Sequence, residues 1–126
     1  MYRIKVEAHF SSAHNLRGYR GKCEALHGHN WRVEVAVGKE GFDKTGMVAD
    51  FKYLKKKLNQ VLERLDHKYL NNILYFKRNN PTSENIARYI YDTLKPRVSG
   101  LDSVTVWESE NCAATYYGED KNFARR

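Results

Sequence analysis

The 126-residue sequence predicts an α+β fold, in which a four-stranded antiparallel sheet carries two helices on one face. Two runs that alternate apolar and polar residues lie near the N-terminus, and two more lie near the C-terminus. Between these pairs stand two segments whose apolar residues recur at helical spacing. The resulting order, β-β-α-α-β-β, is typical of an antiparallel sheet covered by helices. Because no linker-like stretch interrupts the chain, we expect a single domain over residues 1–126.

Strict alternation predicts the two strands at the start of the chain. The first covers residues 2–10 and turns to one side Tyr2, Ile4, Val6, Ala8 and Phe10. The second covers residues 27–37 and turns to one side His27, His29, Trp31, Val33, Val35 and Val37. Residues 11–26 hold Asn15, Gly18, Gly21 and four basic residues and are predicted to form a long loop. Loops of this length in a compact domain are usually functional.

The middle of the chain predicts two capped helices. Asp50 can cap a first helix whose apolar positions are Phe51, Leu54, Leu58, Val61, Leu62 and Leu65. The lysines of this helix are interpreted as a solvated face in preference to a polyanion site. Thr82 is the predicted N-cap of a second helix, which ends before Pro96. Residues 104–108 and 112–117 then predict a terminal hairpin.

Composition narrows the class of protein. A net charge of +7 and a pI near 9.4 suggest an anionic partner, which could be nucleic acid, a membrane surface or a phosphorylated small molecule. No stretch approaches the roughly 20 apolar residues of a membrane helix, and the first five residues resemble a strand more than a signal peptide. We therefore expect a soluble, cytoplasmic protein in which Cys23 and Cys112 are free thiols.

Three histidines are candidate metal ligands. His27 and His29 stand at i and i+2 of a predicted strand, so their imidazoles point the same way and can share one ion. His14 follows the first strand in phase with Phe10 and could supply a third nitrogen. Three histidines suit catalytic zinc, which keeps a fourth position open for water or substrate. The alternative is that His27 and His29 simply end a core-facing stripe.

Three further positions carry candidate chemistry. Cys23 lies in a polar, basic loop and could act as a base or nucleophile, or as a fourth metal ligand. Asp66 and His67 could form an acid/base pair, although a histidine at a helix C-terminus also interacts favourably with the helix dipole. Glu108 shares the face of buried strand residues and would need a ligand with paired N–H donors, unless the strand end reaches solvent.

In combination, these residues resemble the 6-pyruvoyl-tetrahydropterin synthase family, and within it the 6-carboxy-5,6,7,8-tetrahydropterin synthases of queuosine biosynthesis. The resemblance covers nearly the whole chain. Its motifs are Phe10 to His14, Cys23 to His29, Gly46 to Val48 with Asp50-Phe51, Leu65 to His67 with Leu70-Asn71, Pro81 to Asn85, and Val106 to Glu108. Three residues separate Cys23 from His27, as in the carboxy-forming group.

The resemblance implies a tunnelling fold (T-fold), whose sheets join edge to edge into a barrel of subunits, commonly a homohexamer made of two stacked trimers. Active sites would lie between subunits. The matching residues imply zinc ligands at His14, His27 and His29, a catalytic base at Cys23, an acid/base pair at Asp66 and His67, a pterin-anchoring carboxylate at Glu108, and pocket-lining residues at Thr82 and Ser83.

The implied reaction is zinc-dependent. It converts 7,8-dihydroneopterin triphosphate to 6-carboxy-5,6,7,8-tetrahydropterin and releases acetaldehyde and triphosphate. Arg17, Arg20 and Lys22 are candidates for contacting the triphosphate. Two alternatives remain: a pyruvoyl-forming synthase of the same family, and a non-enzymatic module with structural zinc that binds nucleic acid. Against the second, structural zinc sites use four protein ligands, and no recognised nucleic-acid-binding motif occurs. We expect neither a nucleic-acid nor a membrane partner.

Overall fold

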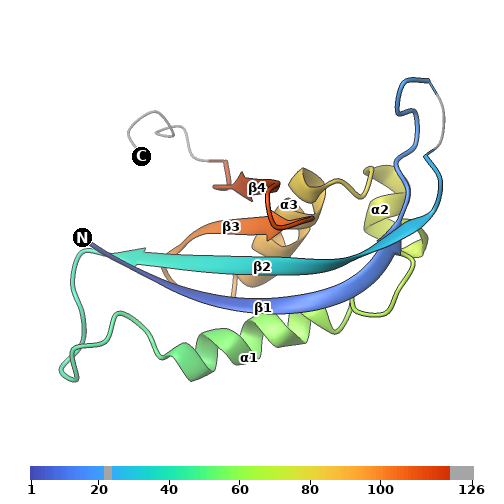
Figure 1. The fold of residues 1–126 in the computed structure, drawn as a ribbon. Helices are drawn as coiled ribbons and strands as arrows, with labels where there is room; N and C mark the ends of the chain where they lie inside the picture. Colours follow the sequence, from blue (N-terminus) through green and yellow to red (C-terminus); the bar gives the residue numbers. More distant parts are fainter. Residues whose placement is uncertain (22–23, 120–126) are drawn as a thin grey trace.

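The computed structural model describes residues 1–21 and 24–119, and Figure 1 shows their arrangement. The strands are β1 (Tyr2–His14), β2 (His27–Lys39), β3 (Leu101–Trp107) and β4 (Ala113–Tyr116). The helices are α1 (Phe51–Leu62), η1 (Leu70–Asn72), α2 (Leu74–Arg78) and α3 (Ser83–Leu94). The predicted order is confirmed, with the two short helices η1 and α2 added where only a connecting segment was expected.

The sheet has the strand order β1-β2-β3-β4, and every neighbouring pair is antiparallel. β1 and β2 form a long hairpin that pairs from Tyr2 with Lys39 to His14 with His27. The predicted loop was therefore wrong for residues 11–14, which belong to β1. These polar residues stay extended because their backbone is paired on both edges: β2 lies on one side and residues 66–69 lie on the other.

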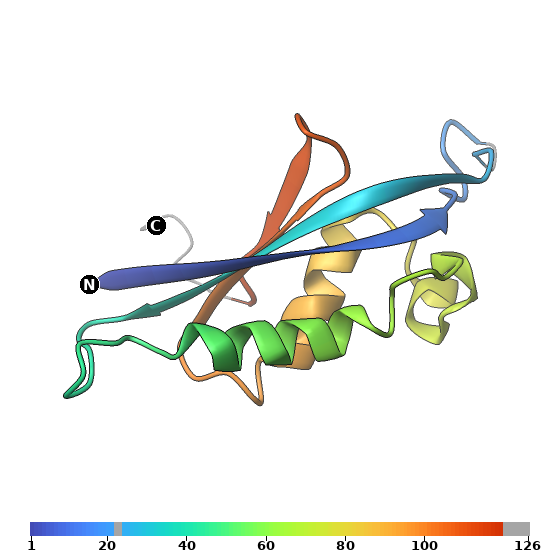
Figure 2. The ribbon, with the colours of Figure 1, turned by 60° about the horizontal axis from the view of Figure 1, so that its bottom comes forward.

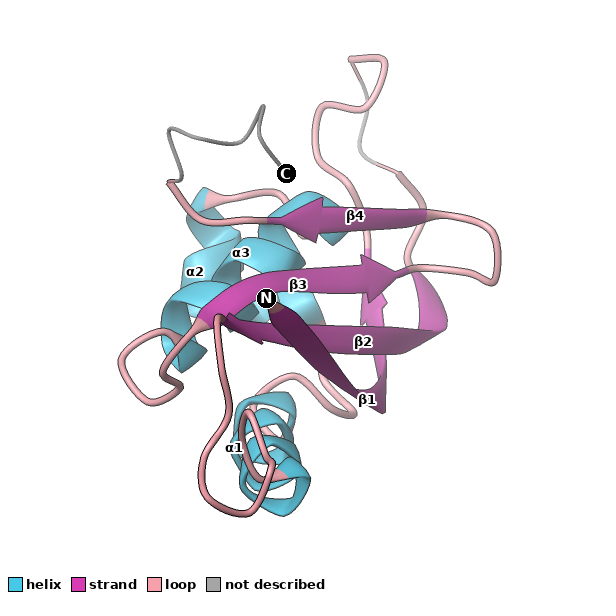
Figure 3. Ribbon diagram, turned by 90° about the vertical axis from the view of Figure 1, so that its left-hand side faces the viewer, coloured by secondary structure: helices cyan, strands magenta, loops and turns pink. Residues whose placement is uncertain are grey.

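One face of the sheet is buried under the helices, as Figures 2 and 3 show, with α1 beside β1 and α3 against β3. The core takes its side chains from alternate strand positions and from one stripe of each helix. The opposite face carries ion pairs between strands: Lys5 with Glu34 and Arg32 with Glu7 join the neighbours β1 and β2, and Arg3 with Asp102 joins β1 to β3 across β2. This division between faces is the one that the alternation predicted.

Both predicted helix caps are present. The Asp50 side chain accepts a hydrogen bond from the Lys52 amide at 2.9 Å, and Thr82 Oγ1 accepts one from the Asn85 amide at 3.1 Å. α1 ends at Leu62, so Asp66 and His67 lie beyond its last turn. The helix-dipole interpretation of His67 is therefore wrong.

The β3–β4 hairpin is confirmed, although β3 begins earlier than predicted, at Leu101. Gly100, just before it, has a φ of +75° and accepts a hydrogen bond from the Gly38 amide, so the turn into the strand uses a conformation that favours glycine. The amide of Glu108 donates to the Cys112 carbonyl at 3.1 Å and closes the hairpin. No helix among the described residues is long and apolar enough to cross a membrane.

Candidate functional site

Three histidine side chains converge at one end of the β1–β2 hairpin. His14 is the last residue of β1 and pairs with His27, the first residue of β2, and His29 follows on the same face. The three ring centroids lie 4.7 to 5.2 Å apart. The Nε2 atoms of His14 and His27 are separated by 3.1 Å. The strand register thus brings together the three residues that sequence spacing singled out.

Backbone carbonyls fix the orientation of two of these rings. His14 Nδ1 lies 2.7 Å from the Pro81 carbonyl oxygen, and His27 Nδ1 lies 2.8 Å from the carbonyl oxygen of Ala25. A carbonyl can only accept, so in both rings the proton sits on Nδ1. The neutral tautomers therefore leave their Nε2 lone pairs directed at each other. Metal-bound histidines are held by second contacts of this kind.

His29 completes the group with a buried ring nitrogen. Its Nε2 atom has no hydrogen-bond partner within the described part of the chain, yet it lies 3.1 Å from Glu108 Oε1. Burial lowers the pKa of His29, which favours the neutral ring that a metal ion requires. The same Glu108 oxygen lies 3.3 Å from His14 Nε2.

The group has the dimensions and chemistry of a metal site. One ligand atom from each of His14, His27, His29 and Glu108 falls within 4.8 Å of every other. Zinc–nitrogen bonds of about 2.05 Å in a tetrahedron place ligand atoms about 3.3 Å apart, close to the observed contacts. Together with the orphaned His29 nitrogen and the two fixed tautomers, this shows that the residues present fit a bound divalent ion.

Glu108 was not predicted as a member of the metal group. It follows β3 directly, and the pairing of Trp107 with Arg32 places it beside Trp31, two residues from His29 on the histidine face of β2. The sequence allowed either a buried carboxylate or a strand end that reaches solvent. The Glu108 side chain is 37% exposed, which is intermediate between these two expectations. The position of Glu108 near the histidines depends on the register between β2 and β3, which the sequence alone does not reveal.

Asp66 and His67 form a contact pair at the outer edge of β1. Asp66 Oδ1 accepts a hydrogen bond from the Ser11 amide at 2.8 Å, and Oδ2 lies 2.9 Å from His67 Nδ1. The Ser11 amide, assisted by His67, holds the pKa of Asp66 below its ordinary value. His67 has a φ of +54° and a side chain that is 82% exposed.

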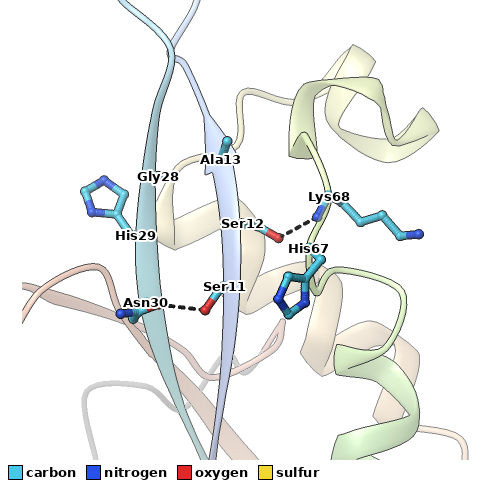
Figure 4. Close-up of a pocket in the computed structure, with 8 residues that line it drawn as sticks. All are labelled: Ser11, Ser12, Ala13, Gly28, His29, Asn30, His67 and Lys68. Carbon is cyan, nitrogen blue, oxygen red and sulfur yellow. Dashed lines mark hydrogen bonds between the residues drawn. The ribbon is translucent and has the colours of Figure 1, made fainter.

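Figure 4 shows that His67 and His29 lie on opposite sides of the β1–β2 pair. An open pocket of about 460 Å³ spans the two strands there, and its lining residues are Ser11, Ser12, Ala13, Gly28, His29, Asn30, His67 and Lys68. A Cβ at Gly28 would meet only the Ser12 carbonyl oxygen, at 3.8 Å, so no described part of the chain crowds this glycine. Among the described residues, Asp66 and His67 make no hydrogen bond or ion pair with the metal group, although His67 and His29 line the same open pocket.

Thr82 and Ser83, the predicted pocket-lining residues, are the N-cap and the first residue of α3. They directly follow Pro81, whose carbonyl accepts from His14. Cys23 and Lys22 lie outside the described residues.

Arg17 and Arg20 precede that gap. The guanidinium of Arg17 donates to the Phe76 carbonyl, and the Arg20 guanidinium lies 5.4 Å from the Tyr19 ring centroid. The Asn80 side chain also pairs with both the amide and the carbonyl of Arg17. These contacts of Arg17 stabilise the loop after β1, and its guanidinium, a candidate for contacting the triphosphate, is already bonded to a backbone carbonyl.

Known proteins resemble this chain along most of its length. The model of the 6-pyruvoyl tetrahydropterin synthase family matches residues 3–119. A 6-carboxy-5,6,7,8-tetrahydropterin synthase of Synechocystis is 42% identical over 123 residues, which cover 93% of this chain and 94% of the relative. A dihydroneopterin monophosphate aldolase of Pyrococcus furiosus is 39% identical over 109 residues, which cover 84% of this chain and 89% of the relative.

Solved structures agree on the fold. The 6-pyruvoyl tetrahydropterin synthase of Caenorhabditis elegans superimposes with a TM-score of 0.83 at 30% identity, over 94% of this chain and 96% of that one. The match therefore includes both strand pairs and the helices between them. On the family match and these relatives, the chain belongs to the 6-pyruvoyl tetrahydropterin synthase family.

Proposed function

We propose that the chain is a zinc-dependent 6-carboxy-5,6,7,8-tetrahydropterin synthase, which converts 7,8-dihydroneopterin triphosphate to 6-carboxy-5,6,7,8-tetrahydropterin, acetaldehyde and triphosphate. The observation that carries this proposal is the convergence of three histidine nitrogens at the end of β1 and β2, in a chain 42% identical to a synthase of that name. The net charge of +7 suits a triphosphate substrate.

His14, His27 and His29 would hold the zinc ion, which when bound makes substrate hydroxyls and the adjacent C–H bond more acidic. The Pro81 and Ala25 carbonyls keep two of these rings in the ligating tautomer. Thr82 and Ser83 follow Pro81 and would line the pterin pocket.

Proton transfer falls to residues outside the metal group. Cys23 would take the carbon-bound proton, a role that requires a reduced thiol and fits a cytoplasmic enzyme. His67 would move protons at the substrate side chain, with the Asp66 carboxylate orienting its ring. Glu108 would accept two N–H hydrogen bonds from the pterin ring.

We further propose that the active site forms between subunits of a homohexamer. His67 is exposed and lies across the β1–β2 pair from His29, so it would serve the metal group of a neighbour. Joining of sheet edges would also cover β4 and the part of β1 before Ser11, whose outer edges pair with no strand among the described residues.

Product identity tests the proposal. Zinc-loaded protein is incubated with 7,8-dihydroneopterin triphosphate, acetaldehyde is trapped, and pterins are identified by mass spectrometry. A 6-carboxy pterin with stoichiometric acetaldehyde is expected. A 6-pyruvoyl pterin would favour the family's other activity, which the Caenorhabditis relative bears in its name.

Cleavage of dihydroneopterin monophosphate with no action on the triphosphate would instead favour an aldolase. This second candidate function is considered because the Pyrococcus relative, which is 39% identical, is a dihydroneopterin monophosphate aldolase. Salt-resistant retention of labelled RNA or DNA, without turnover of any pterin, would favour the nucleic-acid-binding alternative.

A further inference from the structure

Glu108 occupies a position that a pterin anchor alone does not require. Its Oε1 atom lies 3.1 Å from His29 Nε2 and 3.3 Å from His14 Nε2, at the spacing of ligands around one tetrahedral ion. Three neutral histidines alone would leave a divalent ion with its full charge. A carboxylate as the fourth ligand halves that net charge and completes the coordination number that zinc prefers.

We propose that Glu108 is the fourth ligand of the metal ion in the substrate-free enzyme and leaves it when the pterin ring binds. This inference rests on the proposed function, in which the same carboxylate accepts hydrogen bonds from the pterin. On this proposal the Glu108 carboxylate would hold the ion at rest and turn to the N–H donors of the ring when it binds, which would free one position on the ion for a substrate oxygen. No proton or electron is gained or lost in this exchange of oxygen ligands.

The structure gives Glu108 the freedom that such an exchange needs. Its backbone is fixed, because its amide donates to the Cys112 carbonyl and Trp107 before it is paired with Arg32. Its side chain is 37% exposed, and no hydrogen bond to the backbone holds its carboxylate among the described residues. His14 is buried, and the rings of His14 and His27 are each held through Nδ1 by a backbone carbonyl. A carboxylate on a fixed backbone with an open side can therefore rotate between two partners while these two rings stay in place.

The exchange couples recognition to reactivity. A pterin ring offers paired N–H donors, and a carboxylate that accepts two hydrogen bonds is strongly held. The metal position opens only when those donors arrive, so small ligands without a pterin ring are kept from the ion. The site would be closed like a structural zinc site at rest and open like a catalytic one when the ring is bound.

Cobalt substitution tests the inference without turnover. Co²⁺ replaces zinc in the full-length protein, and azide is titrated while the visible absorption of the ion is recorded. In the wild type we expect no azide-dependent change until unsubstituted pterin is added. In Glu108→Gln the spectrum should respond to azide without pterin, and Zn²⁺ affinity should fall roughly 10- to 100-fold. Glu110→Gln removes an equal charge from an exposed residue of the same turn and should behave as the wild type.

Glu108→Asp provides a second variant that keeps the charge but shortens the reach, and azide should gain access in it too. Wild-type protein that binds azide without pterin would overturn the inference, as would an intense sulfur-to-cobalt charge-transfer band, which would make Cys23 the fourth ligand. These outcomes leave the proposed function intact. Failure of the wild type to bind one ion per chain would instead count against the three-histidine site itself.

Discussion

His14 Nε2 and His27 Nε2 lie 3.1 Å apart, while the Nδ1 atom of each ring is committed to a backbone carbonyl. With both protons on Nδ1, two nitrogen lone pairs face each other across a distance at which they repel. A cation between them would turn this repulsion into two coordinate bonds. The pair therefore favours a bound ion, which would link metal binding to folding.

Metal should stabilise the fold strongly. Because the ion binds the folded chain, free Zn²⁺ at about 1,000 times its dissociation constant should add about 4 kcal/mol to the free energy of unfolding. Each kcal/mol corresponds to roughly 3–6 °C in the melting temperature for a chain of this size. Calorimetry of chelator-treated and zinc-restored protein measures the shift. Identical melting temperatures would contradict the metal site.

Replacement of a histidine in the metal group should lower zinc binding, whereas replacement of a histidine outside the group should not. His27→Gln removes a converging nitrogen and should lower bound zinc from about one ion per chain to a small fraction. His9→Gln is the matched control, since His9 is exposed and pairs with Arg32 on the opposite face of the sheet. Elemental analysis after gel filtration gives both values. Equal zinc loss in the two variants would argue against the assignment.

Ser12 should hold the turn that carries Asp66 and His67. Its buried hydroxyl donates to the Leu65 carbonyl and accepts from the Lys68 amide at 3.2 Å. Ser12→Ala leaves both backbone groups without that partner and should cost about 1–3 kcal/mol in urea denaturation.

Ser11→Ala is the control for this effect. It deletes only an exposed hydroxyl contact with Asn30, because the Ser11 amide that binds Asp66 is retained, and it should cost at most about 0.5 kcal/mol. Equal losses in the two variants would show that the Ser12 hydroxyl has no special role.

Asp66 should make stability depend on pH in a defined direction. The Ser11 amide and His67 lower its pKa in the folded protein, so the ionised carboxylate stabilises the fold above its unfolded pKa of about 3.9. That contribution is lost as the pH falls through the folded-state pKa. Asp66→Asn should therefore be less stable than the wild type at pH 7, and the difference should shrink below about pH 4. A difference that stays constant with pH in urea titrations would contradict this linkage.

If active sites are shared between subunits, two inactive variants should restore activity when they assemble into mixed oligomers. His27→Ala lacks the metal group and His67→Ala lacks the acid/base histidine, so each homo-oligomer should be inactive. If each site combines a metal group from one chain with His67 from another, random co-assembly restores about a quarter of the sites. Mixed oligomers, separated by two affinity tags, should regain about that share of activity. Inactive mixed oligomers would place His67 and its metal group in one chain.

The sequence predicts those features that depend on local periodicity. Alternation over residues 27–37 anticipates the buried face of β2, and Asp50 and Thr82 cap the helices that they were predicted to cap. His14 was placed in phase with Phe10, and both are buried on one face of β1. Each of these relations involves residues close in sequence, whose geometry follows from the period of the element.

The features that escaped prediction depend on contacts between distant segments. Residues 11–14 look like a loop by composition, but pairing with residues 66–69 keeps them extended. Glu108 reaches the histidines through the register between β2 and β3, which no local pattern reveals. His67 lies past the end of α1 because the chain leaves the helix at Leu62 to bind the edge of β1.

Metal-dependent product formation tests the central claim most directly. Protein stripped with a chelator is supplied with 7,8-dihydroneopterin triphosphate, and 6-carboxy-5,6,7,8-tetrahydropterin is measured as Zn²⁺ is returned in steps. Product should be absent from the stripped protein and should rise in proportion to bound zinc until one ion per chain is reached. Formation of the carboxy product at full rate by metal-free protein would contradict the role given to His14, His27 and His29.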